Sequence, residues 1–137
     1  MNQRTVDRYV EIARALKSKH QNGRSFHVTC IFDKSKLLSL GFNNYAKEHP
    51  RHKYGVYEAT KPGCNYVSGV HSEISSLLKL GEEDCSRYTF LNIRLDNNNK
   101  VALAKPCPNC FRVLKNQVGF KRIYYTTESS FAVISNI

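Results

Sequence analysis

The chain has 137 residues, a length that fits a single domain able to bury its own core. Hydrophobic residues make up 41% of it and charged residues 23%, and no apolar run approaches the roughly 18 residues that a membrane span requires. The formal net charge of +10 favours anionic partners such as nucleotides or nucleic acid, although the lysines and arginines are scattered rather than gathered in one block. We therefore expect one domain over residues 1–137 and no membrane partner.

The N-terminus and the cysteines bear on the compartment. Residues 1–8 carry charged and amide side chains where a secretory signal would be apolar. The five cysteines are odd in number and unevenly spaced, which argues against a disulfide framework. We expect an intracellular, cytoplasmic protein with reduced thiols, in which Cys30 and Cys85 are small buried side chains.

Hydrophobic periodicity predicts the elements of the N-terminal half. Apolar residues from Val6 to Leu16 recur at helical spacing, which predicts an amphipathic helix that ends near residues 22–23. Residues 26–32 and 36–42 are β-prone runs separated by a short polar stretch, so they read as a hairpin. Residues 43–69 have no sustained period and are rich in basic residues, which predicts a long basic loop or insertion.

The C-terminal half alternates helices and strands. A short helix over residues 72–80 stops at Gly81, and a second helix begins at Pro108 and stops at Gly119. The predicted strands cover residues 88–95, 120–126 and 131–134. The order α-β-β-α-β-α-β-β favours an α/β fold, in which a mixed sheet has helices on both faces.

The stretch "AKPCPNCFRVL" places Cys107 and Cys110 two residues apart, between prolines, at the start of the second of these helices. Such a pair can form a redox couple, hold a structural zinc or ligate a catalytic metal, and the stretch alone does not decide among them.

A further pattern lies upstream, where His71 and Glu73 open the preceding helix in "VHSE". The chain thus reads His71-x-Glu73, 33 further residues, and Cys107-x-x-Cys110, which is the H-x-E…P-C-x-x-C arrangement of the zinc-dependent nucleobase deaminases. One imidazole and two thiolates leave the fourth position of a tetrahedral Zn²⁺ open for water, as in catalytic sites. Glu73 does not have to ligate, so it is free to carry protons as general base and general acid.

A resemblance to one family extends beyond this motif. The stretches "LLSLGFN", "VHSEISSLLKL" and "KPCPNCFRVLKNQVGFKRIYYTT" resemble those of the zinc-dependent cytidine/deoxycytidylate deaminase superfamily, in the same order from about Phe26 to Thr127. The chain is most similar to small deoxycytidylate deaminase-like proteins. The resemblance implies a three-layer α/β/α sandwich with a mixed sheet of about five strands, and usually a homo-oligomer. It also implies hydrolytic deamination of a cytosine nucleotide, with a zinc-bound hydroxide attacking C4 and Glu73 as the proton shuttle.

The same resemblance implies substrate contacts. Asn43, the asparagine of the G-x-N stretch, would contact the sugar, and the main chain at Val70 and Lys105 would hold the base edge. Either Tyr124 or Tyr125 is a candidate to stack on the base, and Tyr124 is favoured. Because side chains alternate along a strand, at least one of the two tyrosines is expected to be core.

Three other residues, His49, His52 and Cys64, match no recognised zinc module, so we predict no second metal. Three functions remain open on the sequence. The first is conversion of deoxycytidylate to deoxyuridylate. The second is deamination of cytosine or adenine in RNA or single-stranded DNA, which the positive charge would suit. The third is a non-catalytic, zinc-stabilised nucleic-acid-binding module, which would make Glu73 dispensable.

Overall fold

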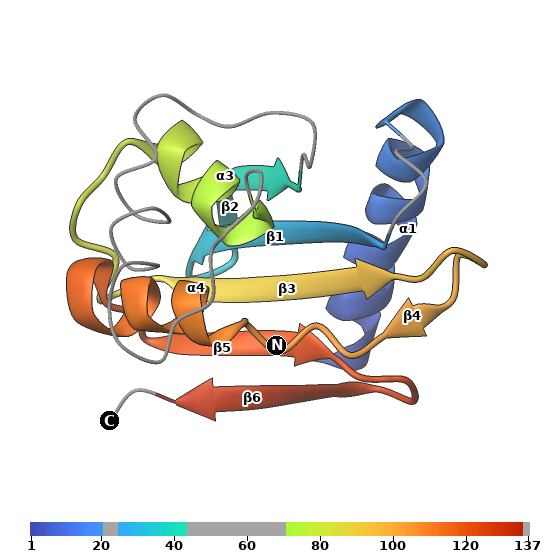
Figure 1. Cartoon of the computed structure of the whole chain (residues 1–137). Coiled ribbons are helices and arrows are strands. Elements are labelled where there is room, and N and C mark those ends of the chain that lie inside the picture. The colour runs from blue at the N-terminus through green and yellow to red at the C-terminus, as the bar shows by residue number, and fades with distance from the viewer. Residues whose placement is uncertain (21–24, 44–70, 136–137) are drawn as a thin grey trace.

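The computed structural model describes residues 1–20, 25–43 and 71–135. Its elements in chain order are α1 (Gln3–His20), β1 (Phe26–Asp33), β2 (Lys36–Phe42), α3 (Ser72–Leu80), β3 (Thr89–Leu95), β4 (Val101–Ala102), α4 (Pro108–Arg112), the π-helix η1 (Val113–Val118), β5 (Arg122–Thr126) and β6 (Phe131–Ser135). Figure 1 shows them arranged about one central sheet.

The sheet is mixed and has the strand order β2-β1-β3-β5-β6, with β4 paired to β3 outside this path. Strands β3 and β5 run parallel, and the other pairs are antiparallel. The predicted mixed sheet is confirmed. It has six strands rather than about five because the two-residue β4, which is too short to show a periodicity of its own, forms where the chain turns back after β3.

Helices cover both faces of the sheet, as predicted, so the molecule has three layers (Figure 1). One core lies between α1 and the sheet and includes Val6, Phe26 and Leu91, whereas the other lies under α3, α4 and η1 and includes Ile74, Leu114 and Ile123. Because alternate residues of a strand face opposite sides, every strand except the two-residue β4 contributes to both cores.

The N-terminal helix α1 follows the predicted amphipathic pattern, since Val6, Val10 and Ala13 are buried against the sheet. Lys17 is also buried, and its ammonium donates hydrogen bonds to the main-chain oxygen of Asp96 and to Asn99 Oδ1, both at 2.7 Å. A buried ammonium needs such acceptors. Lys17 therefore fastens α1 to the turn after β3.

Helix α3 packs closely on β2, and Gly41 is the point of closest approach. A Cβ atom at Gly41 would lie 2.4 Å from the main-chain nitrogen of Ser76, so only glycine lets the helix lie this near. The helix ends at Gly81, which has φ 74° and donates its N–H to the main-chain oxygen of Leu77. Together these two glycines fix the depth and the length of α3.

The last helical segment differs in kind from the prediction. Its bounds agree with the predicted helix, but only Pro108–Arg112 is α-helical and Val113–Val118 continues as a π-helix. π-Helical turns are rare and have no simple sequence signature, so apolar spacing could not identify this one. None of the helices in the described ranges is both long and apolar enough to cross a bilayer.

Candidate active site

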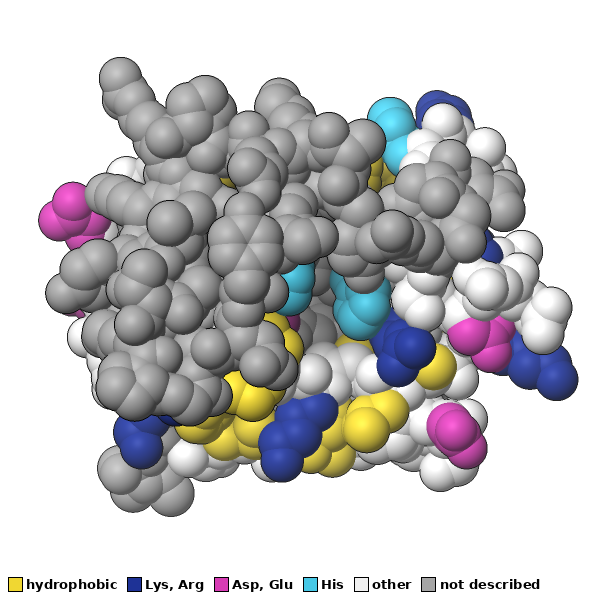
Figure 2. Space-filling view, in the orientation of Figure 1, with side chains coloured by type: hydrophobic (Ala, Val, Ile, Leu, Met, Phe, Trp, Pro, Cys, Tyr) yellow, Lys and Arg dark blue, Asp and Glu magenta, His cyan; other side chains and the backbone are white. Residues whose placement is uncertain are grey.

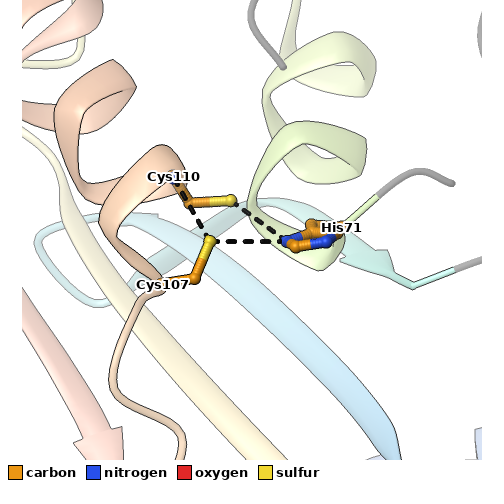
Figure 3. Close-up of side chains that lie close together, drawn as sticks. All are labelled: His71, Cys107 and Cys110. Carbon is orange, nitrogen blue, oxygen red and sulfur yellow. Dashed lines mark hydrogen bonds between the residues drawn. The ribbon is translucent and has the colours of Figure 1, made fainter. Parts of the chain in front are cut away.

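The three predicted ligands meet where α3 and α4 begin. His71 is the N-cap residue of α3, Cys107 is the N-cap residue of α4, and Cys110 lies in the first turn of α4. Cys107 Sγ accepts a hydrogen bond from the main-chain N–H of Cys110 at 3.4 Å, which fixes the Cys-x-x-Cys turn. Figure 3 shows the two sulfurs and the imidazole pointing toward one another from separate helices.

The spacing of these atoms fits a metal ion. The ligand atoms of all three residues lie within 4.8 Å of one another. His71 Nδ1 is 3.6 Å from Cys107 Sγ and 3.4 Å from Cys110 Sγ, so Nδ1 is the nitrogen that faces the sulfurs. In a tetrahedral zinc site the usual bond lengths place nitrogen and sulfur about 3.6 Å apart. The three residues would therefore hold Zn²⁺ with little movement.

The three side chains also suit zinc chemically. They are hydrogen-bonded to one another, and a bound cation would displace the protons that they share. A hydrogen bond from Cys110 lowers the pKa of the Cys107 thiol to about 4. The same bond raises the pKa of Cys110, and a hydrogen bond to Cys107 raises the pKa of His71. Within the described part of the chain no fourth His, Cys, Asp or Glu joins the group. A three-ligand set leaves a coordination position open, as in catalytic rather than structural sites.

Glu73 lies two residues after His71, in the first turn of α3, and its carboxyl is buried. Burial raises the pKa of this carboxyl, and the nearby Cys107 thiolate raises it further. Ser72 Oγ is 3.1 Å from Glu73 Oε1, and Asn92 Nδ2 is 3.2 Å from Glu73 Oε2. Glu73 is thus a carboxyl that binds protons more tightly than usual, beside the candidate metal centre.

Thr29 closes these contacts into a ring. Its Oγ1 is 2.8 Å from Ser72 Oγ and 2.8 Å from Asn92 Oδ1. The ring has four contacts, to which the two hydroxyls and the amide contribute one hydrogen each. Ser72 Oγ donates to Glu73 Oε1, Asn92 Nδ2 donates to Glu73 Oε2, and Thr29 Oγ1 donates to Asn92 Oδ1.

Glu73 and two of the candidate ligands line one pocket of about 100 Å³. Its full lining in the described residues is His27, Asn43, His71, Ser72, Glu73, Ala104, Lys105 and Cys107. Burial, together with the neighbouring Arg94, lowers the pKa of His27 to about 4, so this imidazole is neutral near pH 7. Figure 2 shows histidine side chains on this face, with lysine and arginine side chains among its neighbours.

Two of the residues predicted to contact substrate, Asn43 and Lys105, line this pocket. The Asn43 side chain also braces the main chain, since its Oδ1 accepts from the N–H of His27 at 2.9 Å and its Nδ2 donates to the main-chain oxygen of Ser25 at 3.1 Å. Within the described residues, these two contacts use one of the two amide hydrogens of Asn43. The prediction for Val70 lies outside the described residues, as do those for His49, His52 and Cys64.

The two tyrosines lie on opposite faces of β5, as strand alternation predicts. Tyr124 packs with Phe131 in the core on the α1 side and lines a different cavity, so the preference for Tyr124 as the base-stacking residue does not agree with the structure. Tyr125 on β5 pairs with Asn92 on β3, so the two side chains lie on the same face of the sheet. On that face the Asn92 side chain contacts Glu73. Of the pair, Tyr125 is the one on the side of the candidate metal centre.

Sequence reasoning missed His27, Thr29 and Asn92 as parts of the site. The available signal was a polar residue within an otherwise apolar strand, namely His27 and Thr29 in "FHVTCIF" and Asn92 in "TFLNIRL". Buried polar side chains need partners, and here the partners come from other strands and from α3. The expectation that Cys30 and Cys85 are buried is confirmed.

Comparisons with known proteins agree with this site. No match to the chain is found among curated proteins. The crystal structure at 1.6 Å of a cytidine deaminase from Burkholderia pseudomallei is similar with a TM-score of 0.54 and 15% sequence identity, covering 98% of this chain and 93% of that chain. At this identity the likeness shows the fold. A family model described as the cytidine and deoxycytidylate deaminase zinc-binding region matches residues 3–127. The chain therefore belongs to the cytidine and deoxycytidylate deaminase zinc-binding family.

Proposed function

We propose that this protein hydrolytically deaminates a cytosine nucleotide, and that its substrate is deoxycytidylate, converted to deoxyuridylate. The observation that carries the proposal is the buried Glu73, which lines one pocket with His71 and Cys107 of the cluster that Cys110 completes. When bound by these three residues, Zn²⁺ would supply a Lewis acid that lowers the pKa of a water molecule toward neutrality.

The remaining chemistry falls to Glu73. Its carboxyl would take a proton from the attacking water, deliver it to the ring nitrogen of cytosine and then help to protonate the leaving amine. Water adds to C4, the bond from C4 to the amine breaks, and ammonia and the uracil product leave. Burial raises the pKa of this carboxyl above its ordinary value, which suits a group that must hold a proton between accepting it and delivering it.

The lining of the pocket supports a phosphorylated substrate. Lys105 lines it, and Arg94 stands opposite His27 on the neighbouring strand. Arg94 Nη2 donates to Ser25 Oγ at 3.1 Å, which holds the guanidinium beside this part of the site. Glu73 is the one carboxyl among the described lining residues. The cations would attract a phosphate group.

The test is deamination of a panel that contains cytidine, deoxycytidine, their monophosphates and triphosphates, adenosine, a tRNA and an oligodeoxynucleotide. We expect turnover of deoxycytidylate, and about 10²- to 10⁴-fold less with Glu73→Gln, which is the usual contribution of general acid–base catalysis. Glu73→Gln should keep its zinc because Glu73 is not a ligand. Equal turnover by Glu73→Gln and the parent would refute the proton-shuttle role, and turnover confined to adenosine would refute the cytosine substrate.

A second candidate is favoured by the net charge of +10, namely deamination of a base in RNA or single-stranded DNA. Release of counterions makes polynucleotide binding weaken steeply with added salt, whereas a mononucleotide substrate responds much less. This candidate is selected if only the tRNA and the oligodeoxynucleotide are deaminated. Their turnover should also fall steeply between about 50 and 200 mM salt, as binding does for nucleic-acid-binding proteins. A zinc-stabilised binding module would deaminate nothing on the panel.

A further inference from the structure

We propose that Thr29, Ser72 and Asn92 form a positioning network that holds the Glu73 carboxyl in its working orientation. The inference rests on the proposed function, because it assigns these three residues to the same reaction. None of them would touch the substrate's reacting atoms; each would act through Glu73.

The three residues converge on Glu73 from three separate elements. Thr29 lies on β1 directly opposite Asn92 on β3, and Ser72 lies in the first turn of α3. Ser72 contacts one carboxyl oxygen of Glu73 and Asn92 contacts the other, at 3.1 and 3.2 Å. Thr29 joins the two arms through contacts of 2.8 Å to each. Both carboxyl oxygens are therefore fixed relative to the sheet.

Burial makes these contacts persistent. Glu73 is 7% exposed, and Thr29, Ser72 and Asn92 are 0%, 2% and 3% exposed. With so little access, water does not compete for the hydrogen bonds, and a missing partner would leave a buried polar group unsatisfied. The Glu73 carboxyl therefore has few alternative orientations.

The position of Thr29 and Asn92 in the strands points to a role beyond packing. On the face of the sheet that Thr29 and Asn92 share, the next pair on one side is Ile31 opposite Phe90, both fully buried and apolar. An apolar pair would fill this place without any desolvation of polar groups. The polar pair is explained by what it holds, which is a carboxyl that would otherwise rotate about three side-chain bonds.

The orientation of a proton-transfer group matters because misplacement of about 1 Å can cost about 10²-fold in rate. The experiment compares Thr29→Val, which keeps the shape of the side chain and removes its hydroxyl, with Thr29→Ser, which keeps the hydroxyl. We expect Thr29→Val to lower kcat on the order of tenfold to a hundredfold with KM and zinc content nearly unchanged. Thr29→Ser should retain most of the parent kcat.

Two further variants separate positioning from structure. Ser72→Ala should lower kcat in the same way, and the double variant Thr29→Val/Ser72→Ala should lose less than the product of the two single losses, because both break one network. Ser39→Ala is the matched control. Its buried hydroxyl donates to the main-chain oxygen of Ser76 on the same helix at 2.8 Å without touching the network, so its kcat should stay that of the parent.

Each outcome decides something. An active parent whose kcat survives both Thr29→Val and Ser72→Ala overturns the inference and leaves the proposed function standing. Equal losses in Thr29→Val and Thr29→Ser, or a loss that follows zinc content, also overturn it. If Thr29→Val does not fold, Ser72→Ala decides, because it removes one hydroxyl at a helix start. A parent that deaminates nothing on the panel refutes the proposed function itself.

Discussion

The four described cysteines differ in what their surroundings let them do. Cys107 is partly exposed, and Cys107 and Cys110 lie within reach of His71 Nδ1. Cys30 and Cys85 are fully buried, Cys30 in the core under α1 and Cys85 in the core that also contains Cys110. Burial raises the pKa of the Cys30 thiol to about 12 and that of Cys85 to about 11. Because the thiolate is the reactive form, the two classes should react differently.

We predict that iodoacetamide at pH 8 leaves Cys30 and Cys85 unmodified in the folded protein and modifies both after denaturation in urea. After a chelator removes zinc, the partly exposed Cys107 should be modified while Cys30 stays protected. Peptide mass spectrometry resolves each site. Modification of Cys30 in the folded protein at the rate seen in urea would contradict its placement in the core.

At this scale the sequence predicted which residues gather as candidate ligands, but not the network. His71, Glu73, Cys107 and Cys110 lie within two short stretches whose spacing carries the chemistry. Thr29 and Asn92 are 63 residues apart, and they become neighbours only through the pairing of β1 with β3. Their contact depends on strand register, which spacing along the chain does not reveal.

Among the elements, α3 matters most for the site because it carries His71, Ser72 and Glu73 in its N-cap and first turn. Its bounds were predictable from apolar spacing and from the glycine that stops it. Its depth against β2 was not, because Gly41 lies in a strand 35 residues before Ser76, whose main-chain nitrogen approaches it most closely. A glycine in a strand indicates a close approach but does not name the partner.

We predict that Gly41→Ala destabilises the protein by about 1–3 kcal/mol, because the new Cβ forces α3 outward. The shift moves His71 away from the cysteines, so zinc affinity should fall as well. Gly81→Ala is the control. Its φ of 74° makes alanine strained by about 1–2 kcal/mol, but no atom lies within 4 Å of the added Cβ. Urea unfolding should show similar losses of stability in the two variants. Zinc titration should show weakened binding in Gly41→Ala alone.

In the whole molecule, the two helix starts that hold the candidate ligands belong to one layer, and α1 forms the layer on the other side of the sheet. This layering followed from the order of helices and strands, because helices must cover both faces of a largely buried sheet. The face of the sheet on which an individual side chain lies did not follow from this order. Tyr124 and Tyr125 have the same chemistry and adjacent places, and their faces are set by the register of β5 against β3.

The candidate zinc site joins α3 to α4, whose ligands are separated by more than 30 residues of chain. An ion that binds only the folded chain stabilises it in proportion to the logarithm of its concentration over its Kd. We therefore predict that a chelator lowers Tm and that added Zn²⁺ restores it. If the free zinc concentration is about 1,000 times the Kd, chelation should lower the free energy of unfolding by about 4 kcal/mol.

Two variants make this prediction specific to the site. Cys107→Ala should bind no zinc at the site, so its Tm should already be low and should not respond to the chelator. Cys85→Ala removes a buried thiol from the same core without removing a ligand, so its Tm should be lower than that of the parent and should still fall when zinc is removed. An equal response of Cys107→Ala and Cys85→Ala to the chelator would mean that zinc stabilises the fold from somewhere other than the two helix starts.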